Sequence, residues 1–114
     1  MRIIISNVRC CAILGFALTL IIFCSTSVAA QEAAGTYKAK CTMCHGEDGK
    51  GNTSAGKNLG VRDLSSHDVQ QASDSDLTQI IEKGKNKMPA YGTKLSDAQI
   101  KDLVAYIRQL GKGK

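Results

Sequence analysis

The sequence feature that most constrains the fold is the segment CTMCH, in which Cys41 and Cys44 lie three positions apart and His45 follows directly. The pattern C-x-x-C-H is the attachment signature of a c-type haem. Two thiols at this spacing on a helical turn reach the two vinyl groups of one ring, and the next residue then supplies an axial nitrogen to the iron. A chain with this segment must therefore pack its helices and loops around a large apolar disc.

Three other interpretations of the segment explain less of the sequence. A thioredoxin-like cysteine pair needs a βαβ context and usually opens a helix, whereas this pair closes one. A zinc site needs a fourth ligand and normally a second Cys/His pair. A simple disulfide leaves His45 without a role. The haem interpretation is therefore favoured.

Residues 1–30 have the layout of a secretory signal. Residues 1–9 carry two arginines, an apolar run extends from Cys10 to Cys24, and small residues precede Ala30. This pattern predicts cleavage after Ala30. A retained membrane anchor is the alternative, but the run is shorter than the roughly 20 residues that span a bilayer. We therefore expect an exported, periplasmic domain over 31–114.

Loss of the leader leaves Cys41 and Cys44 as the only cysteines of the five in the chain. A domain of this size has a thin core of its own and often needs a metal, disulfides or another staple. One short-range cysteine pair cannot staple the whole domain. A bound haem fills this gap.

Strand signals are nearly absent, and helix signals occur over 32–44, 74–83 and 97–110. The last helix is the clearest, with Ser96 as N-cap and Gln99 completing a capping box. Gly111 is expected to end it. Its apolar positions fall at helical spacing and should face the core: Ile100, Leu103, Val104, Ile107 and Leu110.

The middle helix begins after Ser73, has Asp76 at its third position and ends at Gly84. A short helical turn is expected within 65–72. The remaining segments are two long loops, a glycine-rich one after His45 and a second one that contains Met88. The sequence therefore predicts an all-α domain with long loops, which need an object to pack against.

Met88 is the candidate for the second axial ligand, because Met/His ligation is an electron-transfer arrangement of haem iron. Pro89 stiffens its loop, whereas Met43 lies between the two cysteines and cannot reach the opposite face. The alternative is an ordinary core methionine. His67 is expected to be a solvated surface residue. With both axial positions filled, no site remains for oxygen or peroxide, so we expect no enzymatic activity.

The chain resembles the class I c-type cytochromes over nearly all of residues 31–114. It is most similar to the small soluble bacterial and plastid members, which share an M-P-A-aromatic segment, here MPAY. In that family an aromatic residue lies four positions before the first haem cysteine, as Tyr37 does, and the C-terminal helix packs across it through residues that match Leu103 and Tyr106. The resemblance implies three to five helices with long loops around one covalently bound haem.

The same resemblance carries details that differ in this chain. Ala33 stands where the family usually has glycine at the helix crossing. The first loop reads AGKNLG without the proline beside which relatives provide an acceptor for the haem histidine, so no acceptor is assigned. Tyr91 is expected to replace a tryptophan that some relatives place near a haem propionate.

The function implied is a one-electron carrier in a periplasmic respiratory or photosynthetic chain, monomeric and without nucleic-acid or membrane binding after cleavage. The alternative is a haem-bearing redox subunit held within a larger oxidoreductase complex. Four lysines would steer an acidic partner, or simply solvate the surface: Lys83, Lys85, Lys87 and Lys94.

Overall fold

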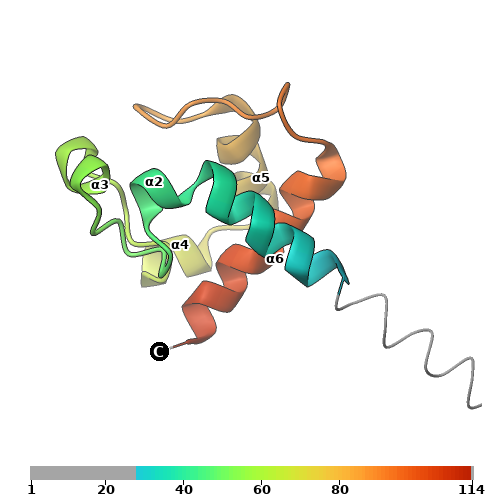
Figure 1. Ribbon diagram of the computed structural model, residues 1–114, viewed down its shortest axis with the longest axis horizontal. Helices are drawn as coiled ribbons and strands as arrows, with labels where there is room; N and C mark the ends of the chain where they lie inside the picture. Colours follow the sequence, from blue (N-terminus) through green and yellow to red (C-terminus); the bar gives the residue numbers. More distant parts are fainter. Residues whose placement is uncertain (1–27, 114) are drawn as a thin grey trace, which may run out of the picture. The chain divides into compact units, whose positions relative to one another are not determined.

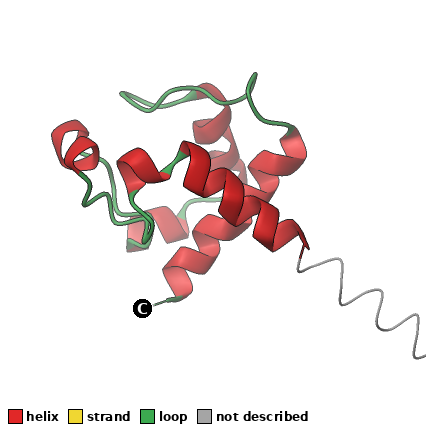
Figure 2. Cartoon of the chain, in the orientation of Figure 1, coloured by secondary structure: helices red, strands yellow, loops and turns green. Residues whose placement is uncertain are grey.

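The computed structural model describes residues 28–113, and the compact unit that carries the fold runs from Glu32 to Lys114. A helix over 28–40 is followed by α2 (Thr42–His45), α3 (Ser54–Leu59), α4 (His67–Gln71), α5 (Asp74–Lys83) and α6 (Asp97–Lys112) (Figure 1). Figure 2 shows helices joined by long loops, with no strand drawn in the described part of the chain. The prediction of an all-α fold is confirmed.

The leader proposed for residues 1–30 lies almost entirely outside the described residues, so its cleavage stays a prediction. No helix within 28–113 is long and apolar enough to cross a membrane.

The first helix differs from its prediction, because 32–44 is not one continuous element. Cys41 forms a turn between the helix over 28–40 and α2. The Thr42 hydroxyl donates a hydrogen bond of 2.7 Å to the Lys38 carbonyl, four residues earlier. Such back-bonding competes with the helical backbone and bends helices. The bend places Cys41 at the junction between the two elements.

The capping signals of α5 and α6 are confirmed. The Ser73 hydroxyl accepts from the Asp76 amide, and the Asp76 carboxylate accepts from the Ser73 amide. Ser96 and Gln99 form the same reciprocal pair at the start of α6. Each pair satisfies two amides that a helix N-terminus leaves without partners.

The end of α6 was predicted wrongly, because the helix continues through Gly111 to Lys112. The glycine serves packing instead. A Cβ at position 111 would collide with the Gln70 side-chain amide. That amide donates to the carbonyls of Leu64, at 2.8 Å, and Ile107, at 3.1 Å. Gly111 therefore leaves room for a side chain that joins α4 to α6.

Helix α3 lies in a segment that was expected to be an irregular loop. The Thr53 hydroxyl accepts from the Gly56 amide at 2.8 Å and caps the helix. Gly60 ends it in the left-handed conformation, with φ 65°. A threonine cap and a terminal glycine were present in the sequence, but the helix is too short for a periodic pattern to reveal it.

The core forms where α6 crosses the first helix (Figures 1 and 2). The Tyr37 and Tyr106 rings lie 4.9 Å apart between centroids, and Leu103 is buried beside them. Ala33 is also buried, at 4% exposure. The buried cluster gathers residues from every helix except α2 and α3: Tyr37, Val69, Leu77, Ile81, Leu95, Ile100, Leu103, Val104 and Ile107.

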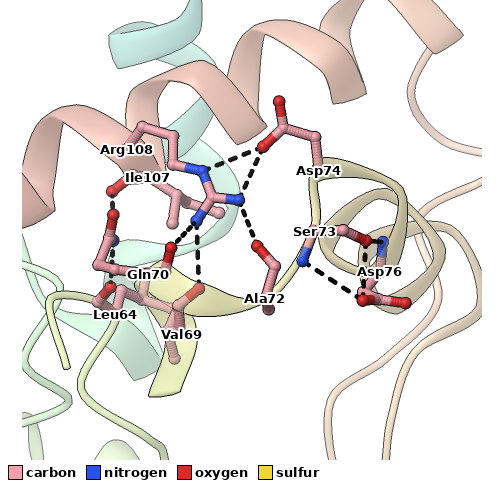
Figure 3. A network of polar contacts seen from close by, with 9 residues as sticks. All are labelled: Leu64, Val69, Gln70, Ala72, Ser73, Asp74, Asp76, Ile107 and Arg108. Atoms are coloured by element: carbon pink, nitrogen blue, oxygen red, sulfur yellow. Dashed lines mark hydrogen bonds and ion pairs between the residues drawn. The ribbon is translucent and has the colours of Figure 1, made fainter. Parts of the chain in front are cut away.

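Arg108 joins α6 to the end of α4, the start of α5 and the residues between them (Figure 3). Its guanidinium donates to the Val69 and Gln70 carbonyls at 3.2 and 3.0 Å and to the Ala72 carbonyl at 2.6 Å. It also pairs with the Asp74 carboxylate at 2.7 Å. A planar fork with five N–H donors suits this set of acceptors, whereas a lysine offers only a point charge.

Candidate cofactor site

A cavity of about 890 Å³ opens between the first helices and the connection from α5 to α6. Cys41, Cys44 and His45 line it from one stretch of chain, and Met88 lines it from that later connection. Its volume lies within the roughly 300–1,000 Å³ of small-molecule and cofactor sites. All four residues singled out in the sequence therefore meet at one cavity.

The two cysteines are free and half-buried. Burial, and then the neighbouring Cys44, raise the pKa of the Cys41 thiol to about 11. A thiol–disulfide catalyst needs the opposite shift, because the thiolate is the nucleophile. Within 28–113, no three His, Cys, Asp or Glu side chains cluster closely enough to hold a metal ion. The raised pKa weighs against the thioredoxin-like interpretation.

His45 is half-buried, and burial lowers the pKa of its imidazole. The imidazole is therefore neutral at pH 7, which is the form that binds metals. Its Nδ1 atom is buried and has no hydrogen-bond partner among the described residues. The sequence assigned no acceptor to this nitrogen, and residues 28–113 provide none.

The backbone around His45 is held from three directions. The Cys44 carbonyl accepts from the Thr53 hydroxyl at 3.0 Å, the His45 carbonyl from the Gly51 amide at 2.7 Å, and the Gly46 carbonyl from the Tyr37 hydroxyl at 2.8 Å. These donors come from the N-cap of α3, the glycine-rich loop and the first helix. Three consecutive carbonyls are thus fixed, which restricts how the His45 side chain can point.

Met88 is positioned by a short turn that begins at Lys85. The Lys85 and Met88 backbones exchange hydrogen bonds of 2.9 and 3.2 Å, and Asn86 has a positive φ of 55°. Gly84 permits the return of the chain, because a Cβ there would lie 2.5 Å from the Met88 carbonyl oxygen. The tight turn therefore ends at Met88, just before Pro89, and returns the chain against the end of α5.

The other histidine and methionine lie where the sequence placed them. His67 is exposed at the start of α4 and does not line the cavity. Met43 is 76% exposed at the cavity rim. Leu59 lies on the same rim and is 39% exposed.

The cavity rim is mainly cationic. Lys94 does not line it, and its ammonium lies 5.5 Å from the centroid of the Tyr91 ring. Two carboxylates, Asp68 and Asp76, also line the cavity. Of the four lysines expected from the sequence, Lys83, Lys85 and Lys87 line the cavity. Two further cations that the sequence did not indicate, Lys40 and Arg62, line it as well.

Comparison with known proteins decides the family. The family model described as "Cytochrome C oxidase, cbb3-type, subunit III" matches residues 28–107. A cytochrome c6 from a Nostoc species is 36% identical over 102 residues, which cover 88% of this chain and 87% of that protein. The chain belongs to the class I c-type cytochromes.

Two further relatives show the breadth of the family. The Cbb3-type cytochrome c oxidase subunit CcoP of Azospirillum brasilense is 38% identical over 93 residues, or 79% of this cytochrome. The cytochrome spans only 32% of that relative's length. The solved structure of the KustC0563 c-type cytochrome matches with a TM-score of 0.64 at 30% identity, covering 68% of this cytochrome and 95% of that chain.

The cofactor of the cytochrome is haem c, covalently bound. The residues at the cavity fit this group, because they offer two free thiols, a neutral imidazole and a thioether around one large space. When bound, the haem supplies an iron that gains and loses one electron. The protein contributes the cavity and the side chains that line it.

Proposed function

We propose that Cys41 and Cys44 hold the haem through thioethers, that His45 and Met88 are its axial ligands, and that the cytochrome is an exported one-electron carrier. One observation carries the proposal: these four residues, from two distant parts of the chain, line the same cavity. Met88 ligation raises the reduction potential and leaves no open iron position, so the cytochrome has no enzymatic activity of its own.

The first experiment compares absorption spectra of the holoprotein and two methionine variants. The wild type should give a thioether-type pyridine haemochrome and the weak far-red band of methionine-ligated ferric haem. Met88→Ala should lose the far-red band, and its ferrous form should bind carbon monoxide. Met43→Ala is the matched control, because Met43 is exposed at the same cavity, and it should retain both wild-type properties. A far-red band that survives Met88→Ala would remove Met88 as a ligand.

A free carrier and a complex subunit are both represented among the relatives. The near-complete coverage of the cytochrome c6 relative supports the carrier, which we therefore prefer. The family model and the CcoP relative favour a subunit of a larger oxidase. Gel filtration of the protein from the periplasmic fraction of its native source separates the two. A carrier should elute as a small monomer whose chain begins at Gln31, and a subunit should elute together with partner chains.

The cationic rim supports docking of an acidic redox partner through Lys83, Lys85 and Lys87. Oxidation by the anionic ferricyanide at low ionic strength tests the local charge. Replacing the three lysines by glutamate should slow it about ten-fold or more, and added salt should reduce the difference. Replacing the exposed Lys50, Lys101 and Lys112 by glutamate makes the same change in net charge away from the cavity and should have a much smaller effect. Equal slowing by both changes would show that only net charge matters.

A further inference from the structure

Tyr91 connects the two segments that supply the proposed haem ligands. Its hydroxyl donates a hydrogen bond of 3.2 Å to the Lys40 carbonyl. Lys40 is the last residue of the helix over 28–40 and directly precedes Cys41. Tyr91 lies three residues after Met88, in the connection between α5 and α6 (orange in Figure 1). The contact therefore spans from the Met88 segment to the attachment segment, at a cavity that both residues line.

The backbone of Tyr91 is fixed as firmly as its hydroxyl. Its amide donates to the Ile81 carbonyl at 2.9 Å, near the end of α5. Its carbonyl accepts from the amides of Lys94 and Leu95 at 2.9 and 3.0 Å. The side chain packs against the buried cluster, and burial raises the pKa of its phenol, which keeps the hydroxyl protonated as a donor. Both the backbone and the side chain of Tyr91 are therefore held in place, so its hydroxyl bond can restrain the neighbouring Met88 segment.

The acceptor also has a physical reason to keep this partner. The last carbonyls of a helix lack amide partners within the helix and must find others. The Lys40 carbonyl is one of these, because the helix stops at the turn formed by Cys41. A tyrosine hydroxyl from another part of the chain satisfies it without adding charge near the cavity.

We infer that Tyr91 is a positioning residue that latches the Met88 segment to the end of the first helix and so protects Met88 from displacement by external ligands. The inference rests on the proposed ligation by Met88. Displacing that thioether requires the connection between α5 and α6 to move away, and the hydroxyl bond to Lys40 resists this motion. Loss of this hydrogen bond should shift the equilibrium between bound and displaced Met88 roughly three- to ten-fold toward the displaced state.

The test is a titration of the ferric holoprotein with imidazole, in which loss of the far-red band reports displacement of Met88. Tyr91→Phe keeps the ring and removes only the hydroxyl. It should bind imidazole about three- to ten-fold more tightly, and its binding rate at saturating imidazole, which reports the opening of the Met88 segment, should rise by a similar factor. Thermal unfolding measured in parallel ensures that both proteins are fully folded at the titration temperature.

Tyr106→Phe is the matched control, because the Tyr106 side chain is half-buried and donates no hydrogen bond among those found in residues 28–113. Its imidazole affinity and limiting rate should equal those of the wild type. Equal values for Tyr91→Phe and wild type would overturn the latch while leaving Met88 ligation intact. A wild type without the far-red band would overturn the ligation and the latch together, which distinguishes the two failures.

Discussion

At the scale of single residues, Tyr37 joins packing to the geometry of the haem-attachment turn. It is 2% exposed, its ring contacts Tyr106, and its hydroxyl donates to the Gly46 carbonyl at 2.8 Å. Burial first, and then the neighbouring Cys41, Tyr106 and Asp48, raise the pKa of its phenol above the ordinary value. The folded protein therefore holds the phenol proton more tightly than the unfolded chain does.

This pKa shift predicts a pH-dependent contribution to stability. Because the folded-state pKa of Tyr37 is raised, its contribution is complete below about pH 10 and is lost as the pH rises above that value. Tyr37→Phe removes the ionisable group and one hydrogen bond, so it should be less stable by about 1 kcal/mol at pH 7. Chemical denaturation at several pH values should show the wild-type and variant free energies of unfolding converging as the pH rises above about 10. Curves that stay parallel would contradict the assignment.

At the scale of helices, two helical glycines should respond oppositely to alanine, because Gly35 faces open space and Gly111 faces Gln70. A Cβ at Gly35 meets no atom within 4 Å, so Gly35→Ala should stabilise the holoprotein by about 0.5–1 kcal/mol. A Cβ at Gly111 collides with the Gln70 amide, whose two hydrogen bonds would be lost. Gly111→Ala should therefore destabilise it by about 1 kcal/mol. Thermal denaturation checks both, and stabilisation by both would show that Gln70 moves aside freely.

The helix starts that were predicted correctly are determined by residues close together in the sequence. Ser73 with Asp76, and Ser96 with Gln99, form capping boxes that short-range spacing alone reveals. The end of α6 was misjudged because glycine both ends helices and allows close packing, and only the position of Gln70 separates the two roles. The break at Cys41 was likewise missed, because the sequence does not show that the Thr42 hydroxyl bonds to the Lys38 carbonyl.

At the scale of the whole molecule, the sequence revealed the side chains of the site but not what holds them. Cys41, Cys44 and His45 form a contiguous motif, and Met88 was found by elimination. The cavity-lining Arg62 and the bond from Tyr91 to Lys40 join distant segments, and no local pattern encodes such contacts. Tyr91 was expected near a propionate, a role that the described contacts do not test. The sequence was therefore enough to propose the haem ligands, whereas the contacts that restrain them required the three-dimensional structure.

The arrangement around one large cavity predicts that folding depends on the haem. The buried cluster contains one aromatic side chain, Tyr37, and several residues packed against the cluster also line the cavity, including Cys41, Leu64 and Met88. A small domain with so thin a core is marginally stable. The double variant Cys41→Ser with Cys44→Ser, expressed without attached haem, should therefore show much weaker helical circular dichroism than the holoprotein. Met43→Ala, altered within the same motif but at an exposed position, should attach haem and keep the full helical signal. A haem-free double variant with native helix content and a cooperative thermal transition would contradict this prediction. It would mean that the polypeptide core folds on its own and that the haem binds to an already folded domain.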